Sequence, residues 1–215
     1  MNKRLEWALV ATIVAASVIG AGKAEARDAS AVAARSVAAV PAQMPVGRQT
    51  LSPLGYVRFC EANPGECGGA RRTAGVVVLD ATALAQLRQV NSSVNGRIRP
   101  LTDIDHYGEV ERWTYPDDGF GDCEDYVLLK RRTLISLGWP AETLLITVVR
   151  DRQGDGHSVL TVATDQGDLV LDNQEEAVLP WYDTGYRFVK RQAQTDADSW
   201  VSLGEVRAPT TVGGN

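Results

Sequence analysis

The sequence predicts an α+β domain in which two helices pack against an antiparallel sheet. Apolar residues first recur at helical spacing, in segments 80–96 and 123–137. The pattern then changes to short strand-like runs, separated by the turn-forming sequences 153–156 and 165–168. Helices followed by a series of strands are typical of the α+β class, so the second helix is expected to lie on one face of the sheet.

Local signals set the limits of these elements. Asp80 is a typical N-cap for the first helix, which Gly96 and Pro100 end. Gly138 and Pro140 end the second helix. The connection between the two helices is polar and is expected to form a loop. Strands are expected at 144–150, 158–164, 169–171 and 186–190.

The chain is expected to contain one folded domain, 51–206. Residues 1–26 have the basic start, the short uncharged run and the small-x-small site of a cleaved secretory signal peptide, with an uncleaved membrane anchor as the alternative. Residues 27–50 are rich in Ala, Val and Ser and are expected to form a flexible arm, and residues 207–215 a disordered tail. Export would place the protein in the periplasm or outside the cell.

Composition narrows the choice of partner. The 215 residues are 44% hydrophobic, with 22 Lys and Arg against 27 Asp and Glu, and the net charge is −5. A nucleic-acid partner is not expected, because no basic run with interleaved aromatic residues occurs. The chain has only three cysteines and two histidines, so nucleophile or metal chemistry must use a very short list of side chains.

Cys60 and Cys67 are expected to form a disulfide. Disulfides persist outside the cytoplasm, and the intervening Asn-Pro-Gly sequence favours a turn that brings the two sulfurs together. Two alternatives remain open. Cys123 pairs with one of the two, or all three cysteines bind a metal, although their spacing matches no zinc-finger pattern.

Cys123, His157 and Asp172 have the residue types of a catalytic triad. Cys123 falls in the first turn of its helix, where the dipole favours a thiolate and backbone N–H groups bind an oxyanion. His157 follows a glycine-containing turn and suits a general base, and Asp172 ends the next strand and suits the orienting carboxylate. Ordinary structural roles also fit each residue: a core cysteine, an exposed turn histidine and a strand-ending aspartate. The last two share a face only if the loop between their strands has an even number of residues.

Three blocks of sequence carry a resemblance to a known family. They are Gly121-Asp122-Cys123-Glu124-Asp125-Tyr126, Asp155-Gly156-His157-Ser158-Val159-Leu160 and Leu169-Val170-Leu171-Asp172-Asn173. In them, the chain resembles the bacterial transglutaminase-like cysteine proteinases, which include periplasmic proteases that process biofilm adhesins. The resemblance implies a papain-like or transglutaminase-like core with Cys123 as nucleophile, His157 as general base and acid, and Asp172 as orienting carboxylate. It also implies a protein substrate, with a surface adhesin as the leading candidate, and an inner-membrane regulatory protein as a partner.

Carboxylates on both sides of Cys123 point to a cation. Asp122, Glu124 and Asp125 disfavour a thiolate between them, although acidic residues in a first helical turn also complement the helix dipole. A bound cation relieves the repulsion, and oxygen ligands of this kind suit calcium. The resemblance implies that Asp122 and Glu124 are the calcium ligands. The chemistry itself requires no cofactor.

Three functions compete for these residues. The favoured one is a periplasmic cysteine endopeptidase, whose thioester on Cys123 is hydrolysed by water. A transglutaminase-type acyltransferase forms the same thioester and passes it to an amine, and a non-catalytic binding module keeps Cys123 for structure alone. In the favoured function the backbone N–H of Cys123 binds the oxyanion. Trp113 is expected in the core or at the edge of the cleft, and His106 on the surface.

Overall fold

The computed structural model describes residues 42–68 and 71–204. The predicted signal peptide and C-terminal tail lie outside these residues, as does most of the predicted arm. Within the described ranges, no helix has the length and apolar character needed to cross a membrane.

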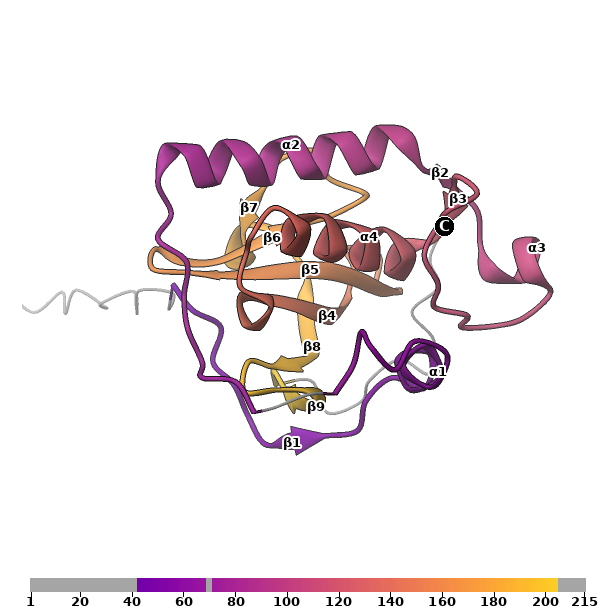
Figure 1. Ribbon diagram of the computed structural model, residues 1–215, viewed down its shortest axis with the longest axis horizontal. Helices are drawn as coiled ribbons and strands as arrows, with labels where there is room; N and C mark the ends of the chain where they lie inside the picture. Colours follow the sequence, from indigo (N-terminus) through magenta and orange to yellow (C-terminus); the bar gives the residue numbers. More distant parts are fainter. Residues whose placement is uncertain (1–41, 69–70, 205–215) are drawn as a thin grey trace, which may run out of the picture. The chain divides into compact units, whose positions relative to one another are not determined.

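An antiparallel sheet is the framework of the domain (Figure 1). Its seven strands run in the order β1-β9-β8-β4-β5-β6-β7. They are β1 (Gln49–Thr50), β4 (Leu144–Arg150), β5 (Gly156–Thr164), β6 (Gly167–Leu171), β7 (Leu179–Pro180), β8 (Arg187–Ala193) and β9 (Asp196–Ser202). Strands β2 (Arg99–Pro100) and β3 (Phe120–Gly121) form a separate parallel pair.

Two long helices cover one face of this sheet. Helix α4 (Cys123–Ser136) packs on β4 and β5, and α2 (Ala81–Arg97) packs on α4 (Figure 1). Asp80 caps α2 as predicted, because its side chain accepts the Ala83 N–H at 2.7 Å. The shorter helices are α1 (Leu54–Ala62), α3 (Asp103–Tyr107), η1 (Ala141–Thr143) and η2 (Trp181–Asp183). The predicted α+β class is therefore confirmed.

Buried apolar side chains form two clusters, one on each face of the sheet. The larger cluster joins both helices to the sheet and includes Leu87, Leu134 and Val148. The smaller one consists of Met44, Val149, Val159, Val170 and Phe188. The neighbours Val148 and Val149 belong to different clusters because successive side chains of a strand point to opposite faces. His157 pairs with Val149 across β4 and β5, so it belongs to the face of the smaller cluster.

The predicted arm reaches too far along the chain. Met44 is buried, and its N–H donates to Asp168 Oδ2 at 2.8 Å. Strand β1, at the end of the predicted arm, pairs with β9. Residues 42–50 thus belong to the folded domain, which begins before the predicted boundary at residue 51. The reason is physical: Met44 fills the smaller cluster and β1 extends the sheet.

Candidate active site

Cys123 is the first residue of α4 and is 1% exposed. Close approach of the preceding strand β3 to this helix turn requires glycine at position 121. A Cβ there would lie 2.7 Å from Asp125 Oδ2. Asp125 Oδ1 in turn accepts the Thr114 N–H at 2.8 Å, which ties the loop before β3 to the helix. The first turn of α4 is therefore fixed by two contacts of Asp125, one with Gly121 of β3 and one with the backbone N–H of Thr114.

His157 and Asp172 meet on one face of the sheet. In the β5–β6 register Leu160 pairs with Leu171 and Thr164 with Gly167, so the loop has two residues, an even number. His157 Nε2 lies 2.8 Å from Asp172 Oδ1. The two side chains are 0% and 2% exposed. The hairpin register, which the sequence left open, is thus the one that a His–Asp pair requires.

Two further groups hold the Asp172 carboxylate. The Tyr186 hydroxyl donates to Oδ2 at 2.6 Å, and the Gln174 N–H donates to Oδ1 at 3.0 Å. Burial acts to raise the pKa of Asp172, but the hydrogen bond and charge of His157 and the Tyr186 hydrogen bond keep it below its usual value. Asp172 is therefore an anion with a fixed orientation. Sequence reasoning missed Tyr186, which appeared only as the first residue of a predicted strand.

The Cys123 thiol forms a hydrogen bond with the carboxylate of the next residue. Its Sγ donates to Glu124 Oε2 at 3.1 Å. His157 Nδ1 is buried and, among the described residues, has no hydrogen-bond partner. Burial first, and then the charges of Glu124 and Asp122, raise the pKa of Cys123 well above its usual value, while the backbone N–H of Ser158 lowers it. Burial and the nearby carboxylates thus favour the protonated thiol, which lies beside the backbone N–H of Ser158, the residue that follows His157.

A cluster of buried carboxylates surrounds this thiol. Asp103, Asp122 and Glu124 each bring an oxygen within 4.8 Å of the others, and all three are buried. Burial and the charge of Asp103 raise the pKa of Asp122 to about 7. Burial and the charge of Asp122 raise the pKa of Glu124 well above its usual value. Such close carboxylates repel each other unless a proton or a cation lies between them.

The members of this cluster differ in part from those considered in the sequence. Asp103 was assigned to a loop, but it begins the short helix α3 and accepts the Arg112 N–H. Asp125, which stood beside the thiol in the sequence, instead binds the Thr114 N–H. Burial raises the pKa of Asp125 to about 9. The pattern Thr102-x-x-Asp105 is the one sequence signal that would have placed Asp103 at a helix start, since Thr102 caps α3.

Two other expectations have a definite outcome. Trp113 is 4% exposed and packs edge-on against Tyr56, so it belongs to the core. Its indole N–H donates to Glu111 Oε2 at 3.3 Å. The His106 side chain is only 15% exposed, because it lies against Tyr107 and pairs with Asp118 at 2.8 Å. His106 is therefore largely covered rather than a free surface residue.

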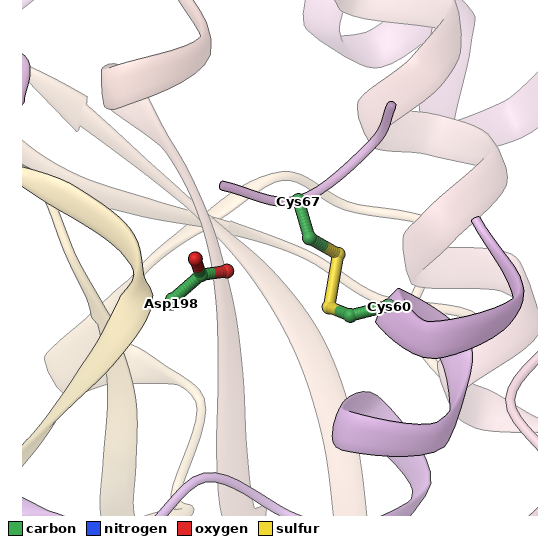
Figure 2. A group of neighbouring side chains, drawn as sticks. All are labelled: Cys60, Cys67 and Asp198. Carbon is green, nitrogen blue, oxygen red and sulfur yellow. A yellow bond between two sulfur atoms is a disulfide. The ribbon is translucent and has the colours of Figure 1, made fainter. Parts of the chain in front are cut away.

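Cys60 and Cys67 form a disulfide between the end of α1 and the turn that follows it (Figure 2). Beside it lies the carboxylate of Asp198, whose Oδ1 accepts the Gly68 N–H at 3.0 Å. Cys123 is buried and is not part of a disulfide. The pairing of Cys123 with another cysteine and the three-cysteine metal site are thus both absent from the described part of the chain.

Fold and sequence together define a cysteine peptidase. Residues 46–208 match the model of the bacterial transglutaminase-like cysteine proteinases, and the chain belongs to this family. The predicted family and the predicted class of enzyme, a cysteine peptidase, are confirmed. The match disfavours the alternative of a non-catalytic binding module. No curated protein matches the sequence.

Solved structures of Legionella pneumophila LapG are similar to this chain. One has 27% sequence identity and a TM-score of 0.46, and the match covers 57% of this chain and 69% of LapG. A calcium-bound form has 27% identity and a TM-score of 0.48, with coverage of 60% and 74%. An EGTA-treated form has 26% identity and a TM-score of 0.47, with coverage of 58% and 70%.

Proposed function

We propose that this cysteine peptidase is an endopeptidase of exported proteins, with Cys123 as nucleophile, His157 as general base and acid, and Asp172 as orienting carboxylate. The observation that carries the proposal is the state of the His157 ring. Asp172 holds Nε2, while Nδ1 is buried without a partner in the described chain. A ring fixed on one nitrogen and free on the other suits a base that accepts a thiol proton.

The proposed reaction uses these three side chains in turn. The thiol turns from Glu124 toward His157 and gives its proton to Nδ1, and the thiolate attacks the carbonyl carbon of the scissile peptide bond. Backbone N–H groups in the first turn of α4 stabilise the oxyanion. The imidazolium then protonates the leaving amine, which breaks the C–N bond and leaves a thioester on Cys123. Water, deprotonated by the imidazole, hydrolyses the thioester and restores the thiol.

The carboxylate cluster fits a calcium ion. Both oxygens of Asp122 and Oε1 of Glu124 are buried and find no donor among the described residues. Ca²⁺ prefers carboxylate oxygens, so Asp103, Asp122 and Glu124 are the proposed ligands. A bound Ca²⁺ would neutralise these charges and thereby lower the electrostatic cost of a thiolate at Cys123. A calcium-bound form is known for LapG.

The cellular setting belongs to the same proposal. Residues 1–26 would direct export and be removed, which places the peptidase in the periplasm or outside the cell, where the Cys60–Cys67 disulfide persists. The proposed substrate is a large surface adhesin or another exported protein, and an inner-membrane protein would regulate the peptidase. The catalytic domain itself would extend from about residue 42 to residue 206.

Proteolysis is tested by comparing protein N-termini in the exported and surface fractions of cells that carry the wild type or Cys123→Ala. New N-termini that occur only with the wild type would establish cleavage and identify the substrate. Cells that carry Tyr182→Phe serve as the matched control, because Tyr182 is 46% exposed. Identical N-termini in the wild type and Cys123→Ala, with both proteins present at equal levels, would contradict the proposal.

A further inference from the structure

Lys130 is a buried lysine in the middle of α4. Its side chain is 0% exposed, and Nζ has no hydrogen-bond partner among the described residues. Lys130 shares its side of the helix with Tyr126, Val127 and Leu134, which are all buried. An apolar residue would pack here without the cost of removing an ammonium group from water. Packing alone therefore does not explain a lysine at this position.

The groups around Lys130 include Asp172, the partner of His157. The charged groups that act on Lys130 are Asp172 and Glu176, both from the segment that follows β6. On its own helix, the Tyr126 ring centroid lies 5.9 Å from Nζ. The Tyr126 hydroxyl donates to Ile98 O at 2.8 Å, which places this side of α4 against the C-terminal end of α2.

Two asparagines of helix α2 form hydrogen bonds with the backbone of this segment, residues 172–176. Asn95 Nδ2 donates to the backbone oxygen of Asp172 at 2.8 Å. Asn91 Nδ2 donates to the backbone oxygens of Glu175 and Glu176 at 3.0 and 3.1 Å. α2 thus adds neutral amides to the surroundings of Lys130, and Asp172 is held by its backbone as well as by its carboxylate.

Several buried polar atoms in this region have no hydrogen-bond partner among the described residues. Asn91 Oδ1, Asn95 Oδ1 and Asn173 Oδ1 are buried acceptors without a donor in the described chain. Lys130 Nζ is a buried donor without an acceptor among the described residues. The region thus holds one buried ammonium on α4 and three buried amide oxygens on or beside the segment that begins with Asp172. Each buried polar group without a hydrogen-bond partner lowers the stability of the folded state, so a set of this size points to a role other than packing.

We propose that Lys130 is a positioning residue for catalysis, which acts on His157 through the charge and the placement of Asp172. The proposal rests on the proposed function, because it takes the His157–Asp172 pair to be the base. A protonated Lys130 competes with the His157 imidazolium for the negative charge of Asp172, and a neutral Lys130 leaves that charge to His157.

The direct test follows the ring NMR signals of His157 as a function of pH. The chain has two histidines, so His106→Gln assigns the signals. In Lys130→Met, the pH at which the His157 signals change is expected to rise by about half a unit, since one competing positive charge is gone. Lys190→Met is the matched control, because Lys190 donates to Leu51 O and is not acted on by Asp172. It is expected to leave the His157 signals unchanged.

A second variant separates charge from packing. Lys130→Gln also removes the charge but keeps a polar side chain, and its His157 signals are expected to shift in the same direction as in Lys130→Met. A merely structural role would change the unfolding temperature and leave the pH of the His157 transition as in the wild type. That result in either folded variant would overturn the proposal.

Alkylation of Cys123 by iodoacetamide distinguishes this proposal from the proposed function. If His157→Ala slows alkylation but the His157 signals ignore Lys130→Met, the role of Lys130 is refuted and the triad stands. If the signals move but alkylation is equally fast in His157→Ala, Lys130 is coupled to His157 and the triad is refuted. The expected result is that the signals move and that alkylation slows by about tenfold in His157→Ala.

Discussion

Cys123 Sγ donates a hydrogen bond to Glu124 Oε2 over 3.1 Å, so the proposed nucleophile is tied to the residue that follows it in the chain. The same carboxylate is a proposed calcium ligand and lies within 4.8 Å of Asp103 and Asp122. One side chain therefore links the thiol to the carboxylate cluster. Calcium bound at the proposed site would therefore change the protonation of the thiol directly, through Glu124.

Removal of the Glu124 charge should free the thiol without calcium. In Glu124→Gln, alkylation of Cys123 by iodoacetamide in EGTA is expected to be about tenfold faster than in the wild type, because the carboxylate charge that raises the thiol pKa is gone. Calcium should no longer accelerate the reaction. Glu109→Gln, which changes an exposed carboxylate nearby, should behave like the wild type. A rate in Glu124→Gln equal to that of the wild type would show that Glu124 does not restrain the thiol.

Calcium should stabilise the fold, and more so at pH 8 than at pH 5. The pKa of Asp122 is raised from 3.8 to about 7, so without a cation the folded state holds a proton that the unfolded state loses. This contribution to stability is full below the unfolded value and is lost as the pH rises through about 7. Calcium binding requires the ionised form, so its effect on the melting temperature grows over the same range.

The measurement is thermal unfolding with calcium chloride or EGTA, at pH 5 and pH 8. Asp103→Asn is expected to reduce the calcium-dependent rise in melting temperature, whereas Asp105→Asn, in the same helix but exposed, is expected to preserve it. A rise that is unaffected by Asp103→Asn would exclude Asp103 as a ligand.

Loss of the Tyr186 hydroxyl should loosen the orientation of the Asp172 carboxylate, and with it that of the His157 ring, while the fold remains intact. This hydroxyl donates to Asp172 Oδ2 at 2.6 Å, and a hydrogen bond to a carboxylate contributes about 1.5 kcal/mol or more. We expect the calcium-dependent alkylation of Cys123 to be about threefold slower in Tyr186→Phe, a smaller loss than in Asp172→Asn or His157→Ala. Tyr182→Phe, at an exposed tyrosine, is the control. Equal rates in both variants would show that Tyr186 does not support Asp172.

Burial of Lys130 should cost stability in a particular pH window. Burial lowers the pKa of Lys130 from 10.5 to about 7, against the opposing charges of Asp172 and Glu176. The folded state therefore binds fewer protons than the unfolded state between about pH 7 and 10.5, so this cost is full below pH 7 and fades as the pH rises. Lys130→Met is expected to stabilise the protein most at pH 6 and least at pH 10, as measured by urea unfolding. A gain that is independent of pH would contradict a buried, titrating ammonium.

Gly121 should tolerate no side chain. In Gly121→Ala the new Cβ would lie 2.7 Å from Asp125 Oδ2, and we expect a loss of about 1–3 kcal/mol in the free energy of unfolding. Gly96→Ala is the control, because it lies in α2 with no atom within 4 Å of the added Cβ, and it should stabilise by about 0.5–1 kcal/mol. If Gly121→Ala leaves the free energy of unfolding unchanged, then β3 and α4 readily move apart.

Hydrophobic periodicity, together with capping and turn residues, predicts the elements that have strong local signals. Asp80 marks the start of α2, and the apolar runs mark β4, β5 and β6. Strand β9 was missed because its sequence, Asp-Ala-Asp-Ser-Trp-Val-Ser, is largely polar, and it becomes a strand by pairing with β8. Strand β1 has two residues and depends on β9 in the same way. Tertiary pairing, rather than local propensity, forms these strands.

The candidate site was likewise predicted from the sequence only in part. Residue type and position point to Cys123, His157 and Asp172, but the sequence leaves the register of the hairpin open. The two-residue loop of that hairpin settles it in the structure. Asp103 and Tyr186 are brought to the site from distant segments by the fold, and no local pattern in the sequence assigns them to it. Lys130 is distinguished only by its burial, which a single charged residue in a helix does not reveal.

The central claim is that His157 activates Cys123, and the rate of Cys123 alkylation tests it most directly. Cys60 and Cys67 are joined in a disulfide, so the Cys123 thiol is the one cysteine left for iodoacetamide to modify, and mass spectrometry counts the added groups. With calcium at neutral pH, the wild type is expected to react about tenfold or more faster than His157→Ala, and Asp172→Asn is expected to lie between them. Equal rates in the wild type and His157→Ala, with both proteins folded, would contradict the account.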